Sequence, residues 1–179
     1  MSKQRAIKFL DAAQIKSLLD STGDKREQAI LQILVTTGLR VHELVELPRE
    51  HFKEETHPEG QTCEIAIVGK GDIQRVIFFS WKTLGTIFEY LKKYPKEDAR
   101  LFPYSIRTIQ YIIKRCGESV GLVVWPHMLR HSFATYALSQ GANLREVQDL
   151  LGHKNLSTTE IYTHTTAPQL KALHKKLFL

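Results

Sequence analysis

The sequence predicts a mainly α-helical domain that carries one small antiparallel β-sheet, an α+β fold class. Apolar residues recur at helical spacing along most of the 179-residue chain, and residues that favour helix ends flank these segments. One segment, 63–79, instead places β-branched and aromatic residues on both sides of a Gly-Lys-Gly-Asp turn, which is typical of a hairpin. With 42% hydrophobic residues, we expect one globular domain over residues 1–179.

Three helices are expected in the first fifty residues. Asp11 followed by Gln14 has the capping-box pattern, and it precedes the apolar positions of "AAQIKSLL". The segment "DKREQAILQILVTTG" continues the helical spacing, and Gly38 is placed to end that helix. The stretch "RVHELVEL" predicts a third, short helix that is stopped by Pro48.

The polar stretch "HFKEETHPEGQT" then predicts a loop before the hairpin. Ile65 and Ile67 alternate with smaller or polar neighbours, and "RVIFF" supplies the returning strand. From Trp81 onward the spacing is helical again, with Pro126 suited to a first helical turn and "STTE" forming another capping-box pattern. The helices expected in this half span roughly 81–93, 105–119, 127–139, 143–151 and 157–164.

Composition excludes several classes of protein. No apolar run approaches the roughly 18–20 residues of a membrane span, and the start "MSKQRAIKFL" lacks the apolar core of a signal peptide. We therefore expect a cytoplasmic protein with no membrane partner, in which Cys63 and Cys116 are free packing residues. The formal net charge of +6 suits a polyanion such as nucleic acid.

The most distinctive motif is "HMLRH", residues 127–131. A helix would place His127 and His131 on one face, the spacing of two zinc ligands, with His153 as a candidate third ligand. Arg130 opposes a metal site because its fixed positive charge would lie beside the ion. A guanidinium near a helix N-terminus instead suits an anion, while a purely structural polar network stays open as an alternative.

Other polar residues could serve the same site. Arg40 follows the glycine that ends a helix, and Glu43 is three residues further on, where it could steer that arginine. Lys70 is at the tip of the hairpin, where a long cation could reach into a cleft. His153 lies in a turn between two expected helices, and Tyr162 follows in the next helix. Each residue alone also has an ordinary structural reading, such as a helix cap or a core tyrosine.

Taken together and in order, Arg40, Lys70, "HMLRH", Leu-Gly-His153 and Tyr162 resemble the catalytic domain of the tyrosine recombinase (phage-type integrase) family. The resemblance covers nearly the whole chain, and its most specific stretches are "HMLRHSFATYAL" and "VQDLLGHKNLSTTEIYTH". It implies the fold of that catalytic domain. The family's N-terminal helical clamp domain is expected to be absent, because the chain leaves no room for it.

The resemblance implies a site-specific DNA recombinase or integrase that breaks and rejoins double-stranded DNA through a covalent 3′-phosphotyrosyl intermediate. It implies no metal, ATP or other cofactor. The implied catalytic residues are Arg40, Lys70, His127, Arg130, His153 and the nucleophile Tyr162, and the implied supporting residues are Glu43 and His131. The sequence departs from the family at His42, where a small polar residue is common, and at Ile73, which is often basic.

In the implied mechanism, two arginines stabilise the charge that grows on the non-bridging phosphate oxygens. Losing one such donor typically lowers a rate by about 10²–10³. His127 and His153 hydrogen-bond the phosphate or assist proton transfer, and Lys70 protonates the leaving 5′-oxygen.

Two other functions stay open. A type IB topoisomerase-like enzyme would share the chemistry and reseal the strand without exchange. A non-catalytic DNA-binding protein could use "NLREVQDLLGHKNLSTTEIYTH" as a helix-turn-helix.

The tail "QLKALHKKLFL" has Leu170, Leu173 and Leu177 on one helical face. Residues 168–179 could pack on their own domain. By resemblance they could instead dock on a neighbouring protomer of a tetramer on DNA.

Overall fold

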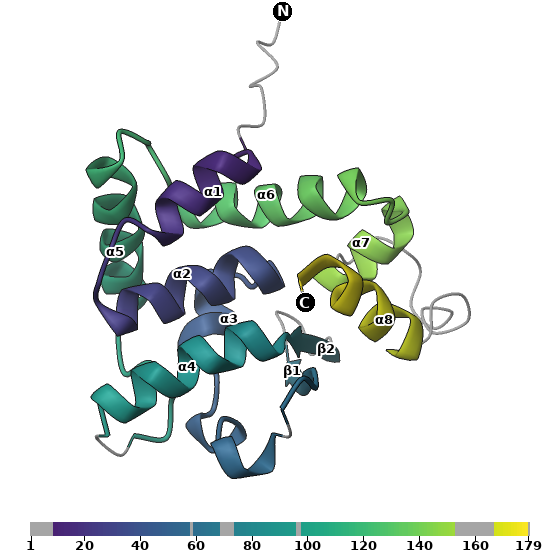
Figure 1. Cartoon of the computed structure of the whole chain (residues 1–179), viewed down its shortest axis with the longest axis horizontal. Coiled ribbons are helices and arrows are strands. Elements are labelled where there is room, and N and C mark those ends of the chain that lie inside the picture. Colours follow the sequence, from purple (N-terminus) through teal and green to yellow (C-terminus); the bar gives the residue numbers. More distant parts are fainter. Residues whose placement is uncertain (1–8, 58, 69–73, 96–97, 153–166, 179) are drawn as a thin grey trace, which may run out of the picture.

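A computed structural model describes residues 9–57, 59–68, 74–95, 98–152 and 167–178. In these ranges the chain is mostly helical and has one two-stranded antiparallel sheet, so the predicted fold class is confirmed. Figure 1 shows α2 at the centre of the helices, with the hairpin and the C-terminal helix gathered at one side. Three predicted site residues, Lys70, His153 and Tyr162, and the helix expected at 157–164 lie outside the described residues.

The first helices begin and end where local signals predict. In α1 (Ala12–Leu19) the Gln14 backbone N–H donates to Asp11 Oδ1 over 2.8 Å, which completes the predicted capping box. Helix α2 (Lys25–Thr37) is capped by Asp24 and ends at Gly38, whose φ of 62° is left-handed. Helix α3 (Val41–Val45) has Glu46 as its C-cap, and Pro48 follows two residues later, a common position for proline after a helix end.

Two single 3₁₀ turns, which the sequence pattern did not indicate, form here. The turn η1 (Arg49–His51) leads into the predicted polar loop, and η2 (Glu54–Thr56) lies within it. Between them Phe52 is buried and packs edge-on against Phe79, with ring centroids 5.2 Å apart. The hairpin of β1 (Cys63–Val68) and β2 (Gln74–Phe79) follows, and its register pairs Cys63 with Phe79 and Ile67 with Arg75. The aromatic contact therefore anchors this loop to the sheet.

The helices expected at 81–93, 105–119, 127–139 and 143–151 agree with their predicted ranges to within one residue at either end, and a further helix forms in the tail. Pro126 is the first residue of its helix, as expected from its fixed φ. The observed helices are α4 (Trp81–Lys93), α5 (Ile106–Ser119), α6 (Pro126–Ser139), α7 (Leu144–Leu151) and α8 (Ala167–Phe178).

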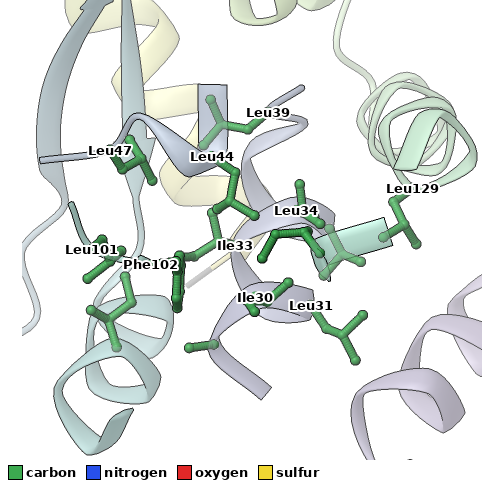
Figure 2. Close-up of a cluster of buried hydrophobic side chains, with 14 of the residues drawn as sticks. Ile30, Leu31, Ile33, Leu34, Leu39, Leu44, Leu47, Leu101, Phe102 and Leu129 are labelled. Carbon is green, nitrogen blue, oxygen red and sulfur yellow. The ribbon is translucent and has the colours of Figure 1, made fainter. Parts of the chain in front are cut away.

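Helix α2 is the centre of the main hydrophobic core. Nine of its thirteen residues are buried, because α1, α4, α5, α6 and the hairpin all pack against it. In Figure 2 the α2 side chains lie among leucines of α3 and α6 and the aromatic ring of Phe102. A helix covered on several sides holds the residues at its C-terminal end in fixed positions, and the site is built on that end.

A second apolar cluster joins α8 to the rest of the domain. Leu177 is buried and Leu170 and Leu173 are partly buried, against a cluster that includes Phe78 of β2 and Phe133 of α6. In this single chain the tail helix therefore packs on its own domain, one of the two predicted arrangements (Figure 1).

Both cysteines are free and buried, as predicted, and burial raises the pKa of the Cys63 thiol to about 11. Of the helices in the described residues, none is both long and apolar enough to cross a membrane.

Candidate functional site

The C-terminal end of α2 brings together residues that are far apart in the sequence. Arg40 lies two residues beyond Gly38 and is the N-cap residue of α3. Glu43, in the first turn of α3, is buried and contacts Arg40 twice. Its Oε2 accepts from the Arg40 backbone N–H over 2.7 Å, and its Oε1 accepts from Arg40 Nη1 over 3.2 Å. This carboxylate therefore fixes both the main chain and the guanidinium of Arg40, the contact that their spacing predicted.

Arg130 reaches the same place from α6. It is only 7% exposed, and its Nη1 donates to the Gly38 carbonyl while its Nη2 donates to the Leu151 carbonyl, each over 2.6 Å. These carbonyls close α2 and α7, where the helix dipole concentrates partial negative charge. Arg130 thus serves as a cap for two helix ends, and two of its five N–H groups are used in doing so.

Gly38 allows these elements to approach. A Cβ atom at this position would lie 2.7 Å from a side-chain carbon of Leu151 and 2.7 Å from one of Phe133. The left-handed backbone and the lack of a side chain are both needed at this residue. Because α6 and α7 close directly onto Gly38, its carbonyl is within reach of Arg130.

A third arginine, Arg75, belongs to this cluster and was missed by sequence reasoning. It is 7% exposed, and its Nη2 donates to Glu43 Oε2 over 2.7 Å. The alternation of buried and exposed residues along the second strand could have indicated Arg75. Arg75 is two and four residues before the buried Ile77 and Phe79, so a charged residue stands in a buried row of β2. Such a charge requires a partner, which in this fold is Glu43.

The cluster carries excess positive charge. Arg40 and Arg75 pair with Glu43 and Arg130 lies close by, so among the described residues the cluster has three guanidinium groups and one carboxylate. Burial, together with the nearby Arg40 and Arg75, lowers the pKa of Arg130 to about 9. Burial also lowers the pKa of Arg75 to about 10, although Glu43 opposes the shift. The cluster is therefore suited to an anion with several oxygen acceptors, such as phosphate.

The two histidines of "HMLRH" lie on the same helix as Arg130 and have exposed side chains. Among the described residues neither His127 nor His131 makes a hydrogen bond or an ion pair, so their predicted roles stay predictions. Within those same ranges no three potential metal-ligating side chains of His, Cys, Asp or Glu gather at one point.

Described residues that adjoin two of the undescribed segments lie at or near this cluster. Gly152 immediately precedes His153, and a Cβ atom on Gly152 would lie 2.7 Å from Arg75 Cδ. The loop that contains Lys70 joins β1 to β2, and Arg75 is the second residue of β2. The structure thus brings together Arg40, Glu43 and Arg130 among the predicted residues and adds Arg75.

Comparison with known proteins agrees with this architecture. The phage integrase family model matches residues 8–168. The tyrosine recombinase XerA of Pyrococcus horikoshii is 38% identical over 178 residues, which cover 94% of this chain and 61% of that protein. A crystal structure of XerA recombinase superposes with a TM-score of 0.71 at 29% identity, over 94% of this chain and 64% of that one.

A second solved structure is a XerH site-specific recombinase bound to difH substrate in a pre-cleavage complex. It has a TM-score of 0.69 at 28% identity and covers 88% of this chain and 50% of that one. This chain spans 56% to 61% of the length of the first curated relatives that it matches. The family model covers most of the chain, and the residues of the arginine cluster lie inside the matched range, so the chain belongs to the phage integrase family.

Proposed function

We propose that this chain is the catalytic domain of a tyrosine-type site-specific DNA recombinase, which breaks and rejoins DNA strands. The observation that carries the proposal is the cluster of three arginines and the buried Glu43, which among the described residues has three guanidinium groups and one carboxylate. Membership of the phage integrase family and similarity to XerA recombinase support the same chemistry. The XerH relative bound to difH substrate supports a DNA partner.

The scissile phosphate is proposed to bind at the exposed edge of this cluster. Arg40, whose side chain is 29% exposed, and the N–H groups of Arg130 that have no partner among the described residues would donate to the non-bridging oxygens. Negative charge grows on those oxygens in the transition state, so fixed donors there stabilise it more than the ground state. Glu43 and the two helix ends hold both arginines in place before DNA binds.

The reaction is a transfer of the phosphoryl group to tyrosine. In the proposal, the phenol oxygen of Tyr162 attacks phosphorus, and the bond from phosphorus to the 5′-oxygen breaks. The phenol proton leaves to His153 or His127, and Lys70 donates a proton to the departing 5′-oxygen. The 3′-phosphotyrosyl bond retains the energy of the phosphodiester, so a second 5′-hydroxyl can reverse the step without ATP. No metal or other cofactor enters these steps.

A nicked suicide DNA substrate tests the proposal. Cleavage beside the nick releases a short strand, so the covalent adduct accumulates and is visible on a denaturing gel. Tyr162→Phe is expected to abolish the adduct, whereas Tyr111→Phe, which alters a 64% exposed tyrosine on α5, is expected to leave it intact. An adduct that survives Tyr162→Phe overturns the assignment of the nucleophile.

The proposed role of Lys70 as the proton donor has its own test. Lys70→Ala is expected to slow cleavage of an ordinary substrate and to be rescued by a 5′-thiolate leaving group, which needs no proton. Absence of rescue removes this role from Lys70. Relaxation of a supercoiled plasmid without strand exchange would instead favour the topoisomerase-like activity.

Self-association into a tetramer on DNA and action inside the cell belong to the same proposal. The apolar face of α8 packs in cis in the single chain, and it could pack in the same manner on a neighbouring protomer. Deleting residues 168–179 and measuring the size of the DNA-bound assembly by light scattering tests this part. An unchanged assembly size would exclude the tail as the link between subunits.

A further inference from the structure

Arg75 is a buried cation that the proposed mechanism does not use. Its Nη2 is bound to Glu43, but Nε and Nη1 are buried and have no hydrogen-bond partner among the described residues. A buried guanidinium with only part of its donors satisfied is unfavourable for stability, because the unpaired N–H groups lose their contact with water. The lowered pKa of this group, about 10, agrees with that environment.

The fold does not need Arg75 to neutralise Glu43. The same carboxylate already accepts from the Arg40 backbone at 2.7 Å and from Arg40 Nη1 at 3.2 Å. An apolar side chain of similar length in place of Arg75 would leave Glu43 with these two donors. Removing one partner of a buried ion pair is destabilising when the other charge is left uncompensated, but Glu43 keeps Arg40 as a charged partner, so we expect the cost of exchanging Arg75 for an apolar group to be small.

The contacts of Arg75 instead join three parts of the site. Through Nη2 it holds Glu43 Oε2, the oxygen that also binds the Arg40 backbone. Through its Cδ and Nη1 it lies against Gly152, where an added Cβ would be 2.7 and 2.9 Å away. It is itself part of the strand that leaves the hairpin turn. The Arg75 side chain therefore contacts Glu43, which supports Arg40, and lies against Gly152 at the end of α7. Arg75 is also the second residue of the strand that follows the Lys70 loop.

We propose that Arg75 is a positioning residue for strand cleavage. It fixes the carboxylate of Glu43, and hence Arg40, relative to the α7 end that precedes His153. This inference rests on the proposed recombinase function and deepens it. Gly152, whose left-handed φ of 65° already favours glycine, also leaves room for this side chain.

The test compares cleavage with stability in Arg75→Met. At saturating nicked DNA, the rate of adduct formation is expected to fall on the order of 10²-fold, the effect of a small misplacement of reacting groups. DNA affinity is expected to change less than about threefold, because phosphate contacts across the whole interface set it. The melting temperature is expected to stay close to that of the wild type, because Glu43 keeps its ion pair with Arg40. Wild-type protein and Tyr162→Phe are measured in parallel, so the chemistry is established independently of Arg75.

Three further variants make the test specific. Arg75→Lys keeps the charge but not the planar fork, and we expect it to stay at least about tenfold slower than wild type. Glu43→Gln is expected to destabilise the fold. In the double mutant Glu43→Gln/Arg75→Met, the melting temperature should recover but the cleavage rate should not. The rate loss of the double mutant should be smaller than the product of the two single-mutant losses. Arg26→Met is the control. That arginine lies on the first turn of α2, about 18 Å from Gly38 along the helix, and pairs with Asp24.

Several outcomes overturn the proposal. A wild-type cleavage rate in Arg75→Met removes any role for the residue. Full activity in Arg75→Lys shows that charge alone matters and not position. Rate losses of Arg75→Met and Glu43→Gln that multiply show that the two residues act separately. A rate loss in Arg26→Met as large as that in Arg75→Met reduces the effect to general stability.

Discussion

Lowering the pH is expected to loosen the C-terminal helix through His174. This side chain is 1% exposed, its Nε2 donates to the Thr36 carbonyl over 3.0 Å, and its Nδ1 has no partner among the described residues. It is enclosed by the rings of Phe78 and Phe178, at centroid distances of 5.9 and 5.0 Å. A proton on Nδ1 would therefore be buried without an acceptor, and burial lowers the pKa of His174 to about 4.

The direction and size of the change in stability follow from the pKa of His174 in the folded and unfolded chain. The unfolded chain binds a proton at His174 near pH 6.5 and the folded chain only near pH 4, so the folded state loses stability as the pH falls through this window. The contribution of the neutral His174 to the stability of the folded state is fully present above pH 6.5. It is about 2 kcal/mol smaller at pH 5 than at pH 7.5, and the loss approaches about 3 kcal/mol below pH 4.

Urea unfolding followed by circular dichroism at pH 7.5 and pH 5 measures this difference. In His174→Gln the amide can still donate to the Thr36 carbonyl but does not titrate, so this variant should lose about 2 kcal/mol less than the wild type over the same change. His42→Gln, at an exposed position of α3, is the matched control and should behave as the wild type. Equal pH dependence in the wild type and His174→Gln would refute this account of His174.

Three other predictions concern the site and its support. Gly38→Ala is expected to lower the free energy of unfolding by about 2–4 kcal/mol, from the left-handed backbone and the clash with Leu151 and Phe133, whereas Gly23→Ala, with open space around it, should change it by less than about 1 kcal/mol. Arg130→Met is expected to remove about 2–4 kcal/mol, because two buried helix-end carbonyls lose charged donors, and an unchanged urea midpoint would contradict this. DNA binding by the isolated chain is expected to be weak and to fall steeply between 50 and about 200 mM salt, and nanomolar, salt-insensitive binding would contradict a one-sided electrostatic contact.

The parts of the fold that depend on neighbours in the sequence were predictable. The capping box at Asp11, the glycine end at Gly38 and the proline start at Pro126 all act within one helical turn. The 3₁₀ turns around Phe52 were not predicted. Phe52 is held by packing on Phe79 across the loop, and no local pattern encodes that contact.

The site was predictable in its residue types but only partly in its contacts. The three-residue spacing of Arg40 and Glu43 indicated their pairing, because both lie at one helix start. The bonds of Arg130 to two carbonyls were beyond prediction, since every residue offers the same backbone acceptor and only the packing selects Gly38 and Leu151. Arg75 was missed for a related reason. Its partner Glu43 is 32 residues away, and its strand was interpreted for its apolar residues alone.

Because Arg130 caps two helix ends, its position in the site depends on the complete packing of the domain. Its two terminal nitrogens each donate over 2.6 Å, one to the Gly38 carbonyl at the end of α2 and one to the Leu151 carbonyl at the end of α7. Both bonds require α6 and α7 to pack against Gly38. A chain in which α7 has come away retains Arg40 and Glu43 but leaves Arg130 without one of its two anchors. The arginine cluster proposed to bind the scissile phosphate is therefore complete only in the fully packed domain. A partly folded chain would bind DNA through its positive charge but would not cleave it.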